Sequence, residues 1–94
     1  MNDIWYSNRV EGATLNPATQ NIGNWNPNCH SFIMVNQTTT IVTIFNGIQL
    51  GIGQSLSFDE MRHGIYNTPF PITFADPDCT GTVNVIKIIK VPIQ

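Results

Sequence analysis

The residues with the greatest potential for chemistry lie in one short segment, Asp59-Glu60-Met61-Arg62-His63. A carboxylate three residues before a histidine is a pattern that acid–base catalysis or metal binding can use. The segment lacks the H-E-x-x-H spacing of a zinc protease, and it offers no second histidine ligand. A surface ion pair between Asp59 and Arg62, worth well under ~1 kcal/mol, explains it more simply. We therefore expect no catalytic residue in this segment.

Three other patterns are weaker. Cys29 and His30 are adjacent, and neighbouring side chains of an extended chain point in opposite directions, so they cannot act as a nucleophile and its base. Asp76-Pro77-Asp78 has too few oxygen ligands for calcium and favours a turn. Gly51-Ile52-Gly53 lacks the lysine and the following helix of a phosphate loop. The sequence thus predicts no catalytic, cofactor or metal site.

The two cysteines, Cys29 and Cys79, leave two alternatives. A disulfide between them would close a long loop and could add about 3–4 kcal/mol to the free energy of unfolding. The N-terminal segment MNDIWYSNRV has no basic region followed by an apolar run, so we expect no secretory signal and favour two reduced thiols. A zinc site is disfavoured because no C-x-x-C pair is present.

Composition indicates one small domain of 94 residues with an unusual surface. Charged residues make up 11% of the chain, against roughly 25% in typical soluble domains. Such a surface suits a protein packed against neighbours or one outside the cell, although an ordinary neutral β domain remains the alternative. The net charge of −2 and the scattered basic residues give no nucleic-acid footprint. No apolar run approaches the ~18 residues of a membrane span.

The chain is organised around the segment from Phe32 to Phe58. It contains β-prone runs, including Thr39–Phe45, an Asn46-Gly47 hairpin turn and a glycine-rich corner. In the run from 39 to 45, Val42 and Ile44 point to one face and their neighbours, also largely apolar, to the other. We therefore expect both faces to be covered, one by the core and one by a partner.

The later part of the chain predicts three more strands, at Gln54–Phe58, Phe70–Phe74 and Thr82–Val91. Prolines 69 and 71 place the second of these at a sheet edge. The last strand changes phase near Lys87, which indicates either a bulge or a second apolar face carrying Ile86 and Ile88. About six strands without helical periodicity predict an all-β fold, a small antiparallel β-sandwich or barrel.

Residues 1–31 are rich in Asn, Gly and Pro and are expected to be mostly irregular. They form either a disordered leader or an extended arm that lies on another subunit. We favour the arm, because Trp5, Tyr6 and Trp25 would serve as buried anchors. The expected division is an arm over 1–31 and a β-sandwich over 32–94.

Two segments, NGIQLGIGQSLSF (Asn46–Phe58) and IYNTPFPITF (Ile65–Phe74), resemble small virion structural proteins of tailed bacteriophages. The shared pattern is an Asn-Gly turn, a glycine corner, a short amphipathic strand and a Thr/Pro-aromatic strand, followed by a closing Val/Ile/Lys-rich strand. The resemblance implies a β-sandwich module that decorates capsids or belongs to head fibres, connectors or tails. Residues 1–31 lie outside it, and the loop 59–64 departs from it.

We therefore expect a bacteriophage virion structural protein, assembled in the host cytoplasm, in the role of a capsid auxiliary or decoration subunit and not of an enzyme. Its partners would be other virion proteins and copies of itself, with no nucleic acid and no membrane. The expected interface residues are Trp5, Tyr6, Trp25, Val42, Ile44, Ile86 and Ile88. The alternatives are a tail or neck component, or a carbohydrate-binding or adhesion module in which Trp5, Trp25 and Tyr66 stack on sugars.

Overall fold

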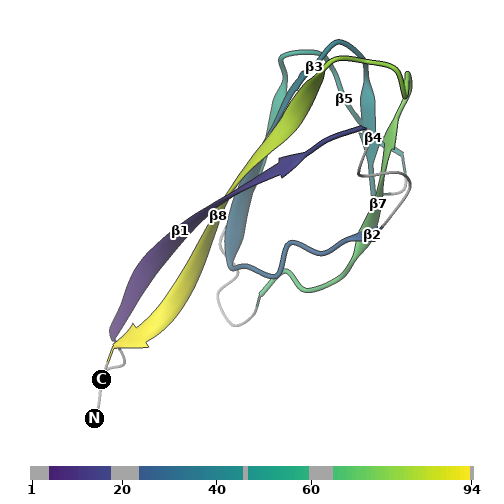
Figure 1. Cartoon of the computed structure of the whole chain (residues 1–94). Coiled ribbons are helices and arrows are strands. Elements are labelled where there is room, and N and C mark those ends of the chain that lie inside the picture. The colour runs from purple at the N-terminus through teal and green to yellow at the C-terminus, as the bar shows by residue number, and fades with distance from the viewer. Residues whose placement is uncertain (1–4, 18–23, 46, 60–64, 94) are drawn as a thin grey trace.

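The structure is a computed structural model that describes residues 5–17, 24–45, 47–59 and 65–93. Within these residues the chain is all β and consists of two antiparallel four-stranded sheets, which confirms the expected small β-sandwich (Figure 1). No helix in the described part could cross a membrane. The strands are β1 (Trp5–Leu15), β2 (Asn24–Trp25), β3 (Ser31–Thr38), β4 (Val42–Ile44), β5 (Ile48–Leu50), β6 (Ser55–Phe58), β7 (Phe70–Phe74) and β8 (Gly81–Ile93).

The first sheet has the strand order β1-β8-β3-β6, and its centre is the long strand β8. β8 pairs with β1 in one unbroken register, from Trp5 opposite Ile93 to Leu15 opposite Val83. The register with β3 is equally continuous. The bulge suggested near Lys87 is therefore absent, and the phase change has the other explanation: β8 carries apolar side chains on both faces.

The outer half of β1 and β8 forms a two-stranded ribbon that projects from the sandwich (Figure 1). β3 reaches only as far as Ile88 on β8, so residues 5–9 and 89–93 pair with each other alone in the described part. The molecule is consequently elongated, with extents of 54 × 21 × 21 Å.

The expected division at residue 31 differs from this structure. Residues 5–15 are an integral strand of the first sheet, and Leu15, Pro27 and Cys29 are buried. The segment that the sequence suggested as a separate arm thus contributes to the same hydrophobic core as the rest of the chain. The projecting element is a ribbon made from both ends of the described chain.

The second sheet has the order β2-β7-β4-β5, so β7 lies between two strands and not at an edge. The edge position expected from its prolines was therefore wrong. β2 is only two residues long and covers just Phe70 and Pro71, and the remainder of that side of β7 has no partner strand in the described residues. Pro69 precedes β7, and Pro71 lies beyond the last pair of the β4–β7 ladder, Ile44 opposite Ile72, so neither proline removes a hydrogen bond from that ladder.

The hydrophobic core lies between the two sheets. Val42 and Ile44 are fully buried there, and Thr43 between them points the other way. Phe45 then takes a positive φ of 53° and packs on the core as well. This left-handed residue breaks the alternation, which explains why both faces of the segment look apolar in the sequence. The largest fully buried apolar side chains are Phe32, Met34, Val42, Ile44, Ile72, Val83 and Val85.

One polar side chain, Asn36, is completely buried and organises the corner between the sheets. Its amide Nδ2 donates to the carbonyl oxygens of Thr40 and Leu50, each at 2.9 Å. Its Oδ1 accepts from the Thr38 N–H at 2.9 Å and lies 2.6 Å from the Thr38 hydroxyl. This amide joins β3, the turn after it and the end of β5, so the corner is fixed by hydrogen bonds and not by apolar packing alone.

Candidate interaction surface

An apolar stripe crosses the outer face of the first sheet. Residues that pair in an antiparallel sheet share a face, and the register places Val10 opposite Ile88 and Ile86 opposite Ile33. These four side chains point away from the core. Val10 is 65% exposed, Ile86 52% and Ile33 44%, whereas Ile88 is half-buried. We call Val10, Ile33, Ile86 and Ile88 the apolar stripe.

Small neighbours explain why the stripe stays exposed. Ile86 lies between Gly12 of β1 and Ile33 of β3, and Ser57 of β6 continues the row. Glycine and serine cannot shield a neighbouring isoleucine from water. The row ends in a hollow of about 300 Å³ whose lining joins the stripe to the sandwich end. The lining residues are Ser31, Phe32, Ile33, Ser57, Phe58, Asp59, Ile86 and Ile88.

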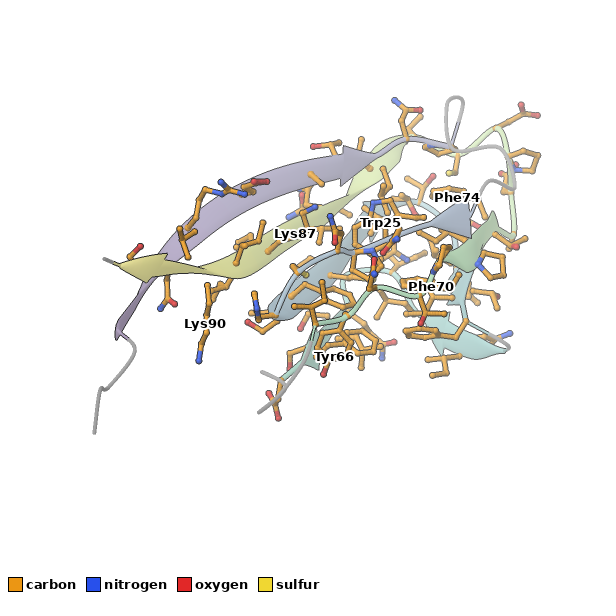
Figure 2. All side chains as sticks on the ribbon, turned by 90° about the horizontal axis from the view of Figure 1, so that it is seen from below. Trp25, Tyr66, Phe70, Phe74, Lys87 and Lys90 are labelled. Carbon is orange, nitrogen blue, oxygen red and sulfur yellow. The ribbon has the colours of Figure 1, made fainter. Side chains whose placement is uncertain are left out.

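Behind the apolar stripe, charged side chains lie on the inner face of β1 and β8 near the base of the ribbon. Arg9 and Glu11 lie on it and form an ion pair, with Nε 3.2 Å from Oε1. Lys87 also points inward, and its Nζ donates to the Pro27 carbonyl at 3.1 Å. The Lys90 N–H donates to Nδ1 of His30 at 2.9 Å. Figure 2 shows both lysines on β8, with Lys87 closer than Lys90 to the aromatic side chains of the sandwich.

An aromatic cluster closes the end of the sandwich beside the ribbon. Trp25 packs edge-on against Phe32 and Phe70, with ring centroids 5.6 and 5.5 Å apart. Phe32 stacks on Phe58 at 4.3 Å. The hydroxyl of Tyr66 donates to the Asp59 carbonyl at 2.5 Å. The aromatic rings thus pack against other rings of the same chain.

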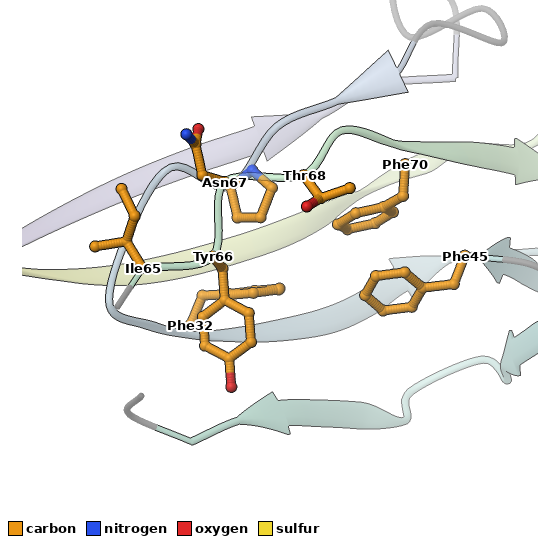
Figure 3. Close-up of a pocket in the computed structure, with 8 residues that line it drawn as sticks. Phe32, Phe45, Ile65, Tyr66, Asn67, Thr68 and Phe70 are labelled. Carbon is orange, nitrogen blue, oxygen red and sulfur yellow. The ribbon is translucent and has the colours of Figure 1, made fainter. Parts of the chain in front are cut away.

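This cluster lines a half-open pocket of about 100 Å³ (Figure 3). Small-molecule sites usually measure about 300–1,000 Å³, so the pocket is too small for a sugar ring with its hydroxyl partners. Trp25 is half-buried beside it and is no exposed stacking platform. The lining residues are Pro27, Phe32, Phe45, Ile65, Tyr66, Asn67, Thr68 and Phe70.

The structure separates the expected interface residues into four groups. Ile86 and Ile88 lie on the apolar stripe. Trp25 lies in the aromatic cluster. Val42 and Ile44 are core residues, so the expectation that they form a face for a partner is corrected: β4 turns them toward the other sheet. Trp5 and Tyr6 belong to β1 in the ribbon, but their side chains lie outside the described residues.

Sequence reasoning missed two residues of the stripe, Val10 and Ile33. Ile33 alternates with Phe32 and Met34, both buried, so its outward direction could have been predicted from β3 alone. Val10 was missed because it lies in the segment 1–31, which was expected to be mostly irregular from its content of Asn, Gly and Pro. The Arg9 and Glu11 charges are tolerated on the inner face because both side chains still reach solvent, with 60% and 40% of their surface exposed.

The described residues offer little for catalysis. They contain no group of three or more side chains able to hold a metal ion. Cys29 and Cys79 are both free. Burial raises the pKa of the Cys29 thiol, an effect that the charge of Lys87 partly offsets, so the thiol stays protonated at neutral pH. Asp76 accepts from the Asp78 N–H at 2.9 Å, which is the turn expected there. Glu60 and His63 lie outside the described residues.

The chain matches no protein-family model, and neither a curated protein nor a solved structure is significantly similar to it.

Proposed function

We propose that this chain is a virion structural protein of a tailed bacteriophage, acting as a capsid auxiliary or decoration subunit. The observation that supports the proposal best is the apolar stripe on the outer face of the first sheet. Large apolar side chains that are exposed together on one face often mark an interaction site, and Ile86, Val10 and Ile33 form such a group. A subunit attached to a shell covers them.

The energetic gain per copy is modest but sufficient in an assembly. Fully burying an Ile or Val side chain contributes about 1.5–3 kcal/mol, and these side chains are roughly half exposed, so each adds about 1 kcal/mol when covered. Attachment through a few such contacts is weak for one copy. When several linked copies attach to one particle, the overall affinity is much higher, because each further contact is made at a high effective concentration.

The low charge and the shape of the molecule support the same proposal. Charged residues are only 11% of the chain, and the described residues contain one ion pair, Arg9–Glu11. A ribbon that projects from the sandwich can reach a neighbouring subunit beyond the flat face. The resemblance of segments 46–58 and 65–74 to virion proteins is the reason for proposing a bacteriophage virion. A neck or tail position would use the same surfaces.

The test is association with particles. Particles prepared without this protein are mixed with the purified chain, and bound protein is separated by density-gradient centrifugation. We expect the wild type to co-sediment and Ile86→Lys to remain at the top of the gradient. Ile52→Lys is the matched control, because Ile52 is 62% exposed but lies in the turn before β6. A wild-type protein that never accompanies particles would refute the proposal.

A further inference from the structure

β1 has little of the protection that edge strands of monomers usually carry: its two charged side chains, Arg9 and Glu11, are of opposite sign and already paired. Among the described residues it forms an outer edge of the first sheet, runs for eleven residues and pairs in register without a bulge. Its sequence, WYSNRVEGATL, contains neither proline nor lysine. Long edge strands of monomers normally carry such devices, since their unpaired backbone groups invite another strand.

The backbone groups that are open can be assigned. Asn36 of β3 exchanges hydrogen bonds with the turn before β6, through its N–H to Gln54 O at 2.9 Å and its C=O from the Gly53 N–H at 2.8 Å. The backbone N–H and C=O groups of successive residues point to opposite sides of a strand. Those of Ile33 therefore point to β8, and those of its partner Ile86 point back to β3. Continuing the alternation across β8, the backbone N–H and C=O groups of the even-numbered residues of β1 point away from β8, toward the open edge. These residues are Tyr6, Asn8, Val10, Gly12 and Thr14.

We propose that a second copy of this chain pairs with this edge, β1 antiparallel to β1, around a two-fold axis through Val10. In this register Val10 lies opposite Val10 of the other copy, and Asn8 lies opposite Gly12. The open N–H and C=O groups of each copy then bond to those of the other. Two four-stranded sheets become one continuous sheet, and the contact is isologous.

Charge complementarity identifies the second copy as the occupant and sets the register. With the axis at Val10, Arg9 of each copy faces Glu11 of the other on the inner face. These two side chains already form an ion pair within one chain, so the pairing closes a ring of four alternating charges. Moving the axis by one residue would oppose Arg9 to Arg9 or Glu11 to Glu11. Two like charges on directly facing residues destabilise a sheet, and two charges of opposite sign stabilise it.

The pairing also continues the apolar stripe. Val10 is the most exposed of its members, and on the outer face it would contact Val10 of the second copy. The two stripes then merge into one apolar band across the dimer. Residues 5–9 in the ribbon of each copy run beside residues 11–15 of the other, which gives the projecting ribbon a partner. The inference holds whether or not the protein belongs to a virion.

The first experiment measures the mass of the full chain in solution by sedimentation velocity over a wide concentration range. We expect a wild-type dimer and a monomeric Val10→Pro variant. Proline at this position removes an N–H that points to the open edge, so the β1–β8 ladder keeps all its hydrogen bonds. Val10→Thr, which retains the N–H and the branched side chain, is the matched control and stays dimeric. Circular dichroism checks that each variant is folded.

The second experiment isolates the contact between copies. Arg9→Glu and Glu11→Arg should each be monomeric, because each opposes like charges across the axis. Mixed together, they should form a heterodimer, seen by native mass spectrometry, since the two acidic side chains of one copy then face the two basic side chains of the other. The like charges within each chain remain, so only pairing between copies explains this rescue. A monomeric wild type, a dimeric Val10→Pro variant or a mixture without heterodimers would each overturn the proposal.

Discussion

Gly81 at the start of β8 lies directly against the backbone of Gln37 in β3. A Cβ atom at Gly81 would stand 2.1 Å from the Gln37 carbonyl oxygen, and the residue has a φ of 87°. No side chain fits this approach, and no residue other than glycine adopts this backbone conformation without strain. The contact fixes where β8 leaves the turn and joins β3.

Gly81→Ala should therefore lower the free energy of unfolding by about 2–4 kcal/mol, the combined result of the strained backbone and the displaced carbonyl. Urea denaturation followed by tryptophan fluorescence measures the change. Gly12→Ala is the control, because a Cβ at Gly12 meets nothing within 4 Å, and its stability should change little. Equal stability of the two variants would contradict the close approach.

Asn36→Leu should cost about 3 kcal/mol or more. The substitution keeps the number and branching of the side-chain heavy atoms but leaves the carbonyls of Thr40 and Leu50 and the Thr38 N–H without their partner in a buried corner. Unsatisfied buried groups cost about 1–3 kcal/mol each. Thermal and urea unfolding measure the loss. Gln37→Leu, at the exposed neighbouring position, is the control and should change stability much less.

The stability of the protein should decline in alkaline solution through Cys29. Burial raises the pKa of this thiol in the folded state above the ordinary value of 9.0. Above that pH the unfolded chain ionises while the folded chain stays protonated, so the contribution is fully present below pH 9.0 and is lost as the pH rises toward the folded pKa. Urea unfolding at a series of alkaline pH values measures the decline.

Cys29→Ala provides the comparison for this pH dependence. The variant is less stable at neutral pH because the buried thiol is lost, but its stability should fall less steeply above pH 9.0. Thiol labelling gives a second measurement: Cys79, which is only partly buried, should react faster than Cys29 in the native protein. Identical pH profiles for wild type and Cys29→Ala would show that the thiol is not responsible.

Removal of residues 1–28 should unfold the domain. The deletion takes away β1, the buried Leu15, and Pro27, whose carbonyl accepts the Lys87 hydrogen bond. It also exposes the whole edge of β8. A far-ultraviolet circular dichroism spectrum without β structure, or loss of the protein to aggregation, is the expected result. A folded fragment 29–94 would restore the view of residues 1–31 as a separable arm.

The sequence predicts the middle and end of this fold well because local patterns there agree with the tertiary structure. β3 and β6 alternate between more buried and more exposed side chains, β8 is a long β-branched run, and the glycine corner falls where the chain turns between β5 and β6. β1 was missed because the ribbon extends past the second sheet. One face of it lacks a core to cover, so Arg9 and Glu11 interrupt the apolar pattern by which a strand is recognised.

The candidate surface was predicted only in part, for a related reason. Ile86 and Ile88 are anomalous in a strand whose other face is already apolar, and this anomaly marks them correctly as outward-facing. Val42 and Ile44 show the same anomaly, but Phe45 supplies another cause through its positive φ. A run of apolar residues does not reveal which of two faces is covered by the same chain, since that depends on strand order.

The ribbon also determines how the molecule responds to mechanical load. Trp5 pairs with Ile93, and both ends of the described chain lie at the tip of the ribbon (Figure 1). A pulling force applied at these two ends loads the hydrogen bonds between β1 and β8 one after another, as in unzipping, and not all together as in shear. The ribbon therefore opens at low force from its tip, while the sandwich, held by Asn36 and the buried core, stays intact until the opening reaches Leu15.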